Sequence, residues 1–168
     1  VTAQSTVFAA PWERDAGTAE IAAVAKAADS AGLFYLAVSD HVCVPRDKAA
    51  AMSTIWYDCV ATLGYLAAVT QRLRLLSYVY VPAYRHPLQT AKAFAPLDAL
   101  SNGRVILGVG AGHLEGEFAS LGVEFEGRGA MLDEAIDCIA AAFTSEYPEH
   151  EGPRWRVSGV GQRPRPVQ

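Results

Sequence analysis

The chain alternates short apolar runs with longer helical patterns, and this alternation limits its possible folds more than any other feature. Residues 33–39, 72–81 and 104–110 are nearly continuous apolar runs, which is typical of buried strands in a parallel sheet. Residues 5–10 form a further candidate strand ahead of them. Parallel neighbours need a long crossover, and helices usually supply it. The sequence therefore predicts four βα units and an α/β fold.

Each expected strand is followed by a helical pattern. Thr18 is the expected N-cap of the first helix and Gly32 its stop, while Pro87 suits the first turn of the third helix and Pro96 is expected to kink it. The expected helices span residues 18–32, 57–71, 86–103 and 129–145. The apolar stripe of the last one consists of Leu132, Ile136, Ile139 and Phe143.

Two architectures fit such a repeat, a doubly wound open sheet and part of a (β/α)₈ barrel, and periodicity does not separate them. In both architectures, the binding and catalytic residues lie at the carboxyl ends of the strands. The segments expected there are residues 39–45, 77–87 and 108–118. They contain three of the four histidines.

Composition excludes several classes of protein. With 51% apolar residues the 168-residue chain can bury the core of one domain, and a net charge of −4 disfavours nucleic acid and anionic lipid as partners. No apolar run reaches the roughly 18 to 20 residues of a membrane helix, and no signal peptide is evident, so we expect a cytoplasmic protein. Cys43, Cys59 and Cys138 form no C-x-x-C pair, which predicts reduced thiols and no metal site.

The stretch GVGAGHLEGEF, residues 108–118, is a strand-to-helix corner rich in small residues. It is not a G-x-G-x-x-G dinucleotide fingerprint, because the third glycine would fall on His113. Small residues still let a flat ring or a phosphate approach the backbone, and a following helix N-terminus offers N–H groups to an anion. A tight turn without a ligand explains the same residues.

Four motifs, taken together, point to a family. They are S-D-H at 39–41, Y-R-H-P at 84–87, L-D-x-L-S-x-G-R at 97–104 and G-V-G-x-G at 108–112. With the stretches around them they resemble the luciferase-like monooxygenase superfamily, most closely its oxidoreductases that depend on flavin or on the deazaflavin coenzyme F420. The resemblance covers essentially the whole chain.

The resemblance implies a TIM barrel with the reduced flavin ring at the carboxyl ends of its strands. Four βα units are half of the eight in a closed barrel, so we expect residues 1–168 to be one domain, the N-terminal half of a TIM-type (β/α)₈ barrel. Residues 147–168 are expected as an irregular, solvated tail. Open edges and an uncovered inner face predict a homo-oligomer or pairing with a second half-barrel.

The resemblance also implies site residues. His41 would be catalytic, by hydrogen bonding or proton transfer, although a loop histidine that caps a carbonyl is the alternative. A non-prolyl cis peptide is implied between Ser77 and Tyr78, where Tyr78 replaces a small aliphatic residue and could be an ordinary strand aromatic. The implied cofactor-binding residues are Asp40, Ser77, Tyr78, Gly110, Ala111, Gly112 and His113.

The implied chemistry is hydride transfer between coenzyme F420 and a small organic substrate, or delivery of reduced FMN to oxygen. His113 stands where sugar-phosphate dehydrogenases of the family place an acidic proton donor, which makes a sugar phosphate a less expected substrate. Glu115 and Glu117 are expected to face solvent at a helix N-terminus. Two other hypotheses stay open: a non-catalytic half-barrel assembly module, and an unrelated doubly wound protein that binds a nucleotide at residues 108–113.

Overall fold

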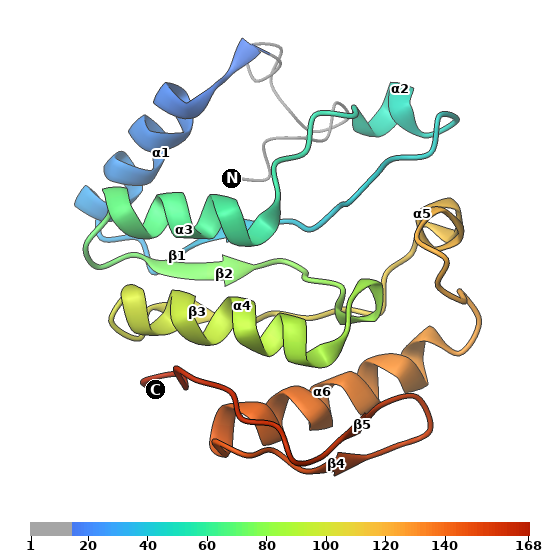
Figure 1. Cartoon of the computed structure of the whole chain (residues 1–168). Helices are drawn as coiled ribbons and strands as arrows, with labels where there is room; N and C mark the ends of the chain where they lie inside the picture. Colours follow the sequence, from blue (N-terminus) through green and yellow to red (C-terminus); the bar gives the residue numbers. More distant parts are fainter. Residues whose placement is uncertain (1–14) are drawn as a thin grey trace. The chain divides into compact units, whose positions relative to one another are not determined.

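The computed structural model describes residues 15–168, which form two compact units (Figure 1). The first unit comprises the described residues up to Tyr80 together with Ile106–Gly108, and the second comprises Val81–Val105 and Val109–Gln168. The strand expected at residues 5–10 lies outside the described residues. The expectation of one domain over the whole chain stays a prediction.

The first unit is a parallel βα arrangement. Its elements are α1 (Thr18–Ser30), β1 (Tyr35–Val38), α2 (Ala49–Met52), α3 (Cys59–Val69) and β2 (Arg74–Ser77). β1 and β2 pair in parallel from Tyr35 opposite Arg74 to Val38 opposite Ser77. β3 (Val105–Ile106), of which Ile106 belongs to this unit, follows β2 in the sheet order. Helix α3 packs on both β1 and β2, and α1 packs on α3. The strands expected at 33–39 and 72–81 and the helices expected at 18–32 and 57–71 are therefore confirmed. The strand expected at 104–110 is reduced to two residues, and α2 is an addition.

The N-cap of the first helix lies one residue earlier than expected. Gly17, not Thr18, is the N-cap of α1, and its backbone N–H donates to the Glu20 carboxylate at 2.8 Å. The Glu20 side chain therefore satisfies a backbone donor at the helix start, where the helix itself supplies no acceptor. At the other end Gly32 has a φ of +74°, a conformation that suits glycine and stops the helix as expected.

The second unit is built around two long helices. Its elements are η2 (Pro82–Tyr84), α4 (Pro87–Leu100), α5 (Glu115–Ser120), α6 (Arg128–Thr144), β4 (His150–Glu151) and β5 (Arg156–Val157). Helix α4 packs on α6, and η2 contacts both helices. Pro87 occupies the first turn of α4 as expected, and Pro96 lies inside that helix.

The buried face of α6 is rotated from the expected stripe. Ile136 is 40% exposed, whereas Ile139 is buried as predicted. The buried residues are Met131, Ala135, Cys138, Ile139 and Ala142. Small residues at 135 and 142 allow α6 to approach α4 and η2 closely, so close packing, rather than the largest apolar side chains, selects the face.

Residues 147–168 are partly irregular and exposed, as expected, but they also include a short hairpin and fixed contacts. β4 and β5 pair antiparallel, with His150 opposite Val157, and β4 packs on α6. The segment after the hairpin is tied to α4, because Gln162 Nε2 donates to the Leu88 carbonyl at 2.8 Å and the Val167 N–H donates to the buried Asp98 carboxylate at 2.9 Å. These partners lie about seventy residues away in sequence, beyond the reach of local patterns.

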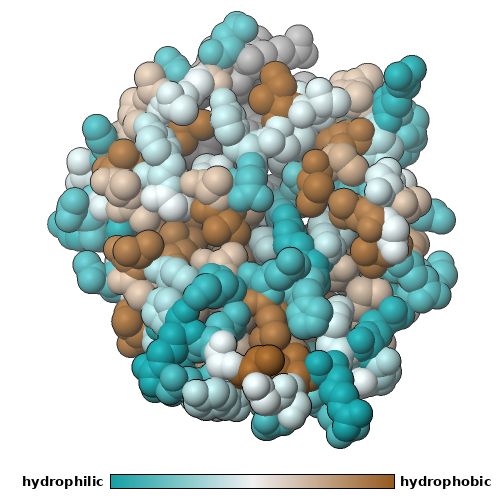
Figure 2. All heavy atoms as spheres, viewed as in Figure 1, coloured by the Kyte–Doolittle hydropathy of each residue, from teal (hydrophilic) through white to brown (hydrophobic). Residues whose placement is uncertain are grey.

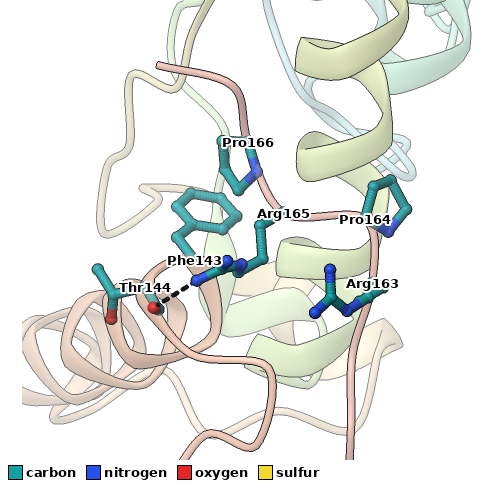
Figure 3. Close-up of a pocket in the computed structure, with 6 residues that line it drawn as sticks. All are labelled: Phe143, Thr144, Arg163, Pro164, Arg165 and Pro166. Carbon is teal, nitrogen blue, oxygen red and sulfur yellow. Dashed lines mark hydrogen bonds between the residues drawn. The ribbon is translucent and has the colours of Figure 1, made fainter.

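The same segment borders a hollow of about 760 Å³. Figure 3 shows Arg165 reaching back to the end of α6, where its guanidinium donates to the Thr144 carbonyl at 3.0 Å. Arg163 pairs with Glu146, and the peptide between Arg163 and Pro164 is cis. Both arginines are thus engaged in holding the segment in place.

Hydrophilic and apolar residues are interspersed on the face drawn in Figure 2. Over residues 15–168, no helix combines the length and the apolar character needed to cross a membrane.

Candidate functional site

Asp40 and His41 follow the carboxyl end of β1. Asp40 is buried, and His41 is half-buried with its ring edge-to-face against Trp56, at 4.4 Å between ring centroids. Trp56 was not among the residues expected from sequence. It lies fifteen positions after His41 in a loop, where no periodic pattern could have linked the two.

Tyr78 follows the carboxyl end of β2, and its backbone is held on both sides. Its N–H donates to the Val38 carbonyl at 2.8 Å, and its carbonyl accepts from Ser39 Oγ at 3.1 Å. Its side chain is 62% exposed and that of Val79 is 37% exposed. The segment that carries Tyr78 is therefore tied to the residue just before Asp40, while its apolar side chains face solvent.

The non-prolyl cis peptide lies between Tyr78 and Val79, not between Ser77 and Tyr78. A non-prolyl cis peptide was therefore expected correctly after β2, but its position was wrong by one residue. Ser77 still belongs to the regular end of β2, paired with Val38.

Gly108 belongs to the same unit as these residues. It exchanges two hydrogen bonds with Ser77 Oγ, and its carbonyl also accepts from the Tyr80 N–H at 2.8 Å. A Cβ at position 108 would lie 2.3 Å from the Ser77 carbonyl oxygen. The absence of a side chain at 108 is thus required by the approach of the two chain segments, with or without a ligand.

In the first unit, the structure brings Asp40, His41, Ser77 and Tyr78 to the same edge of a parallel sheet, as predicted from the strand ends. Ser77 is fully buried and its hydroxyl is engaged by Gly108. Tyr78 and His41 are the members with exposed or partly exposed side chains.

The other four expected cofactor-binding residues, Gly110, Ala111, Gly112 and His113, lie in the second unit. Gly110 and Ala111 are partly exposed and His113 is exposed. Gly112 has a φ of +82°, and a Cβ there would lie 2.7 Å from the Phe118 ring. Its carbonyl accepts from Arg128 Nε at 3.2 Å. The turn at Gly112 is therefore set by Phe118 and Arg128.

Glu117 differs from expectation. Glu115 is exposed as predicted, but Glu117 is fully buried and accepts a hydrogen bond from the Tyr84 hydroxyl at 2.9 Å. Phe118, the next residue, belongs to a core cluster with Val81, Ala83 and Met131. Helix α5 thus buries a carboxylate together with an aromatic ring.

Neither the carboxyl ends of β1 and β2 nor the corner at residues 110–113 gathers potential metal ligands. Within residues 15–168, no cluster of three or more histidine, cysteine, aspartate or glutamate side chains could hold a metal ion. The reactive groups at the carboxyl ends of β1 and β2 are the imidazole of His41, the buried carboxylate of Asp40 and the phenol of Tyr78.

Comparison with known proteins decides the family. The model of the luciferase-like monooxygenase family matches residues 3–168. The chain belongs to the luciferase-like monooxygenase family. This membership excludes the unrelated doubly wound protein considered from sequence.

Members of the luciferase-like family that resemble the chain include proteins of different function. An uncharacterized protein of Mycobacterium tuberculosis is 33% identical over 88% of this chain and 56% of its own. An F420-dependent glucose-6-phosphate dehydrogenase of Amycolatopsis mediterranei is 34% identical over 90% of this chain and 46% of its own. The crystal structure of the monooxygenase RslO1 from Streptomyces bottropensis superposes with a TM-score of 0.80 at 28% identity, over 89% of this chain and 44% of that one.

The chain spans about half the length of the curated luciferase-like relatives it matches. Its α/β fold is that of half a luciferase-like TIM barrel, as the sequence predicted. Luciferase-like relatives include oxidoreductases and monooxygenases.

Proposed function

We propose that the chain contributes to an oxidoreductase site that uses reduced coenzyme F420 to transfer hydride to a small organic substrate. One observation carries the proposal: the backbone of Tyr78 is clamped between Val38 and Ser39 while its side chain stays exposed, at the edge of the sheet where Asp40 and His41 lie. Family membership and an F420-dependent relative support the choice of cofactor.

The residues at this edge fit a flat aromatic group. Tyr78 and Val79 expose apolar surface, and the hydrogen bonds of the Tyr78 backbone with Val38 and Ser39 hold the chain that carries it in place. Apolar surface of this kind favours contact with a ring, because contact removes both from water. When bound, the deazaflavin would supply the hydride.

His41 is the proposed catalytic residue, and Asp40 the proposed cofactor-binding neighbour. An imidazole can both donate and accept a proton, so His41 would hold or move a proton at the reacting atom of the substrate. Its contact with Trp56 limits the orientations of the ring. Asp40 is buried next to it in sequence, where its carboxylate would orient polar groups of the cofactor.

Ser77, Tyr78, Gly110, Ala111, Gly112 and His113 complete the proposed cofactor-binding set. Ser77 would contribute by fixing the end of β2 just before Tyr78, and not by contacting the cofactor, because its hydroxyl is hydrogen-bonded to Gly108. The corner at 110–112 would accommodate the cofactor through its lack of bulky side chains. We include in the proposal that a second half-barrel, from another copy or another chain, completes the site, and that FMN is the alternative cofactor.

The proposal is tested by a fluorescence titration of the purified chain with oxidised coenzyme F420 and, in parallel, with FMN, with the oligomeric state measured by light scattering. We expect saturable binding of F420 to an oligomer. A Tyr78→Asp variant should weaken binding at least tenfold, because a charge would replace the apolar surface that is proposed to meet the ring. Phe34→Ser is the control, because Phe34 is also an exposed aromatic residue but lies just before the amino end of β1, away from the proposed site.

Binding of FMN but not of F420 would overturn the choice of cofactor. Failure of both to bind at millimolar concentration would overturn the proposal for this chain and favour the assembly module. His41→Ala should leave F420 binding within about twofold of the parent and reduce turnover by ~10²-fold or more.

A further inference from the structure

Trp56 is held in place by hydrogen bonds within the loop that follows α2. Helix α2 ends at Met52, and its C-cap Ser53 turns the chain with a φ of +64°. The Trp56 Nε1–H donates to the Ser53 carbonyl at 3.3 Å. Ser53 Oγ accepts from the Ile55 N–H at 3.1 Å. A non-glycine residue in this conformation is uncommon and needs local support, which these bonds supply. The loop fixes the indole against the His41 ring.

Apolar side chains around this pair are left in water. Val42 directly follows His41, Ile55 and Tyr57 flank Trp56, and all three are exposed. Tyr78 and Val79, tied to the same segment through Ser39, are exposed as well. Exposed apolar residues thus flank both His41 and Trp56 in the sequence, and apolar groups beside a candidate site suit an apolar ligand.

Charge in this segment is unfavourable for an anion. Residues 40–58 contain three aspartates against one arginine and one lysine. Lys48 Nζ already lies 3.2 Å from the carboxylate of Asp47, and the Asp58 carboxylate accepts from the Ala61 N–H at the start of α3. Phosphate recognition in proteins relies on concentrated Arg and Lys donors. This segment supplies no such concentration.

We infer that Trp56 is a substrate-contacting, specificity-determining residue beside His41, and that the part of the substrate it meets is uncharged and apolar or aromatic rather than a phosphate. The inference rests on the proposed function, because it takes His41 as the residue that meets the substrate. The Trp56 ring then contributes an aromatic face to an aromatic or apolar substrate, in contact with the imidazole that handles the proton.

The test follows the Trp56 indole and His41 imidazole signals by NMR in the purified chain, while 2-naphthol or glucose 6-phosphate is added. We expect 2-naphthol to shift both signals saturably and glucose 6-phosphate to shift neither at tenfold higher concentration. Trp56→Ala should weaken 2-naphthol binding at least tenfold, whereas Trp56→Phe should retain most of the affinity because a ring remains. Phe34→Ser should bind as the parent chain does.

Circular dichroism and urea unfolding of each variant separate loss of binding from loss of folding, and Trp56→Phe keeps the test informative if Trp56→Ala does not fold. Equal shifts with glucose 6-phosphate, or parent-like 2-naphthol binding by folded Trp56→Ala, would overturn the inference. If F420 binds but 2-naphthol does not shift Trp56, the inference fails and the proposed function stands. If 2-naphthol binds and neither coenzyme does, the proposed function fails, and the substrate assignment fails with it.

Discussion

Ser77 and Gly108 exchange hydrogen bonds through one hydroxyl. Ser77 Oγ donates to the Gly108 carbonyl at 2.9 Å and accepts from the Gly108 N–H at 3.0 Å. The pair joins the end of β2 to the segment that follows Ile106, and it lies immediately before the exposed Tyr78. A buried serine is thus fully satisfied by the backbone of a glycine that has no room for a side chain.

Gly108→Ala is predicted to destabilise the chain by about 3 kcal/mol or more, because the new Cβ would meet the Ser77 carbonyl oxygen at 2.3 Å and neither backbone can move freely. Urea unfolding followed by circular dichroism measures the effect. Gly129→Ala is the control: it lies in α6 with nothing within 4 Å of the added Cβ, and we expect no loss or a gain of ~0.5–1 kcal/mol. Equal stability of the two variants would contradict the prediction.

Substitutions at Gly112 and Gly122 distinguish the cost of a strained backbone conformation from the cost of a steric clash. Both have positive φ, +82° and +68°, but only at Gly112 would a Cβ meet a side chain, the Phe118 ring at 2.7 Å. Gly122→Ala is predicted to cost about 1 kcal/mol from conformation alone, and Gly112→Ala about 1–3 kcal/mol more from the clash. Thermal or urea unfolding of both variants gives the difference, and a larger loss for Gly122→Ala would refute the assigned role of Phe118.

Asp29 is predicted to make stability depend on pH. The backbone N–H groups of Gln71, Arg72 and Leu73 donate to its carboxylate at 2.7–2.9 Å, and these bonds hold its pKa below the usual value. Because the folded-state pKa is lowered, the stabilisation is present above the ordinary carboxyl pKa and is lost as pH falls through the folded-state pKa.

Asp29→Asn should therefore lower the urea midpoint most at neutral pH, and the gap to the parent chain should narrow as pH falls below about 4. Asp47→Asn, at an exposed aspartate of the same unit, should follow the parent curve closely. A gap that does not change with pH would mean that the charge of Asp29 is not what the backbone donors recognise.

Glu134 holds the C-terminal hairpin to α6. Its carboxylate accepts from the Trp155 N–H at 2.8 Å and the Arg154 N–H at 3.0 Å, and it lies 3.6 Å from His150 Nε2. Burial alone would raise the pKa of Glu134, but the two N–H donors and the nearby imidazole outweigh it and leave the pKa lowered. The stabilisation is thus present at neutral pH and is lost in acid.

Glu134→Ala is predicted to destabilise the hairpin by about 1–3 kcal/mol, because two backbone donors lose a charged acceptor. Hydrogen exchange at the amides of Arg154 and Trp155 should accelerate accordingly. Asp137→Ala, an exposed position on the same helix, provides the comparison. Unchanged exchange in Glu134→Ala would show that other contacts hold the hairpin.

The elements that sequence predicted correctly depend on local patterns. The helices that contain Pro87 and Ile139, the strands at the three apolar runs and the stop at Gly32 all follow from interactions within a few residues. The motifs around His41 and Gly112 also indicated the family, and through it the half-barrel fold.

Tertiary structure decided what depends on residues far apart in the chain. The contact of His41 with Trp56, the burial of Glu117 beneath Tyr84 and the clamps at Asp29 and Glu134 join segments without any shared periodicity. The same holds for the final segment, which was expected in solvent but is fastened to Asp98 in α4. Local propensity determines which residues form a helix or strand, whereas packing determines which faces meet and which polar groups must find partners there.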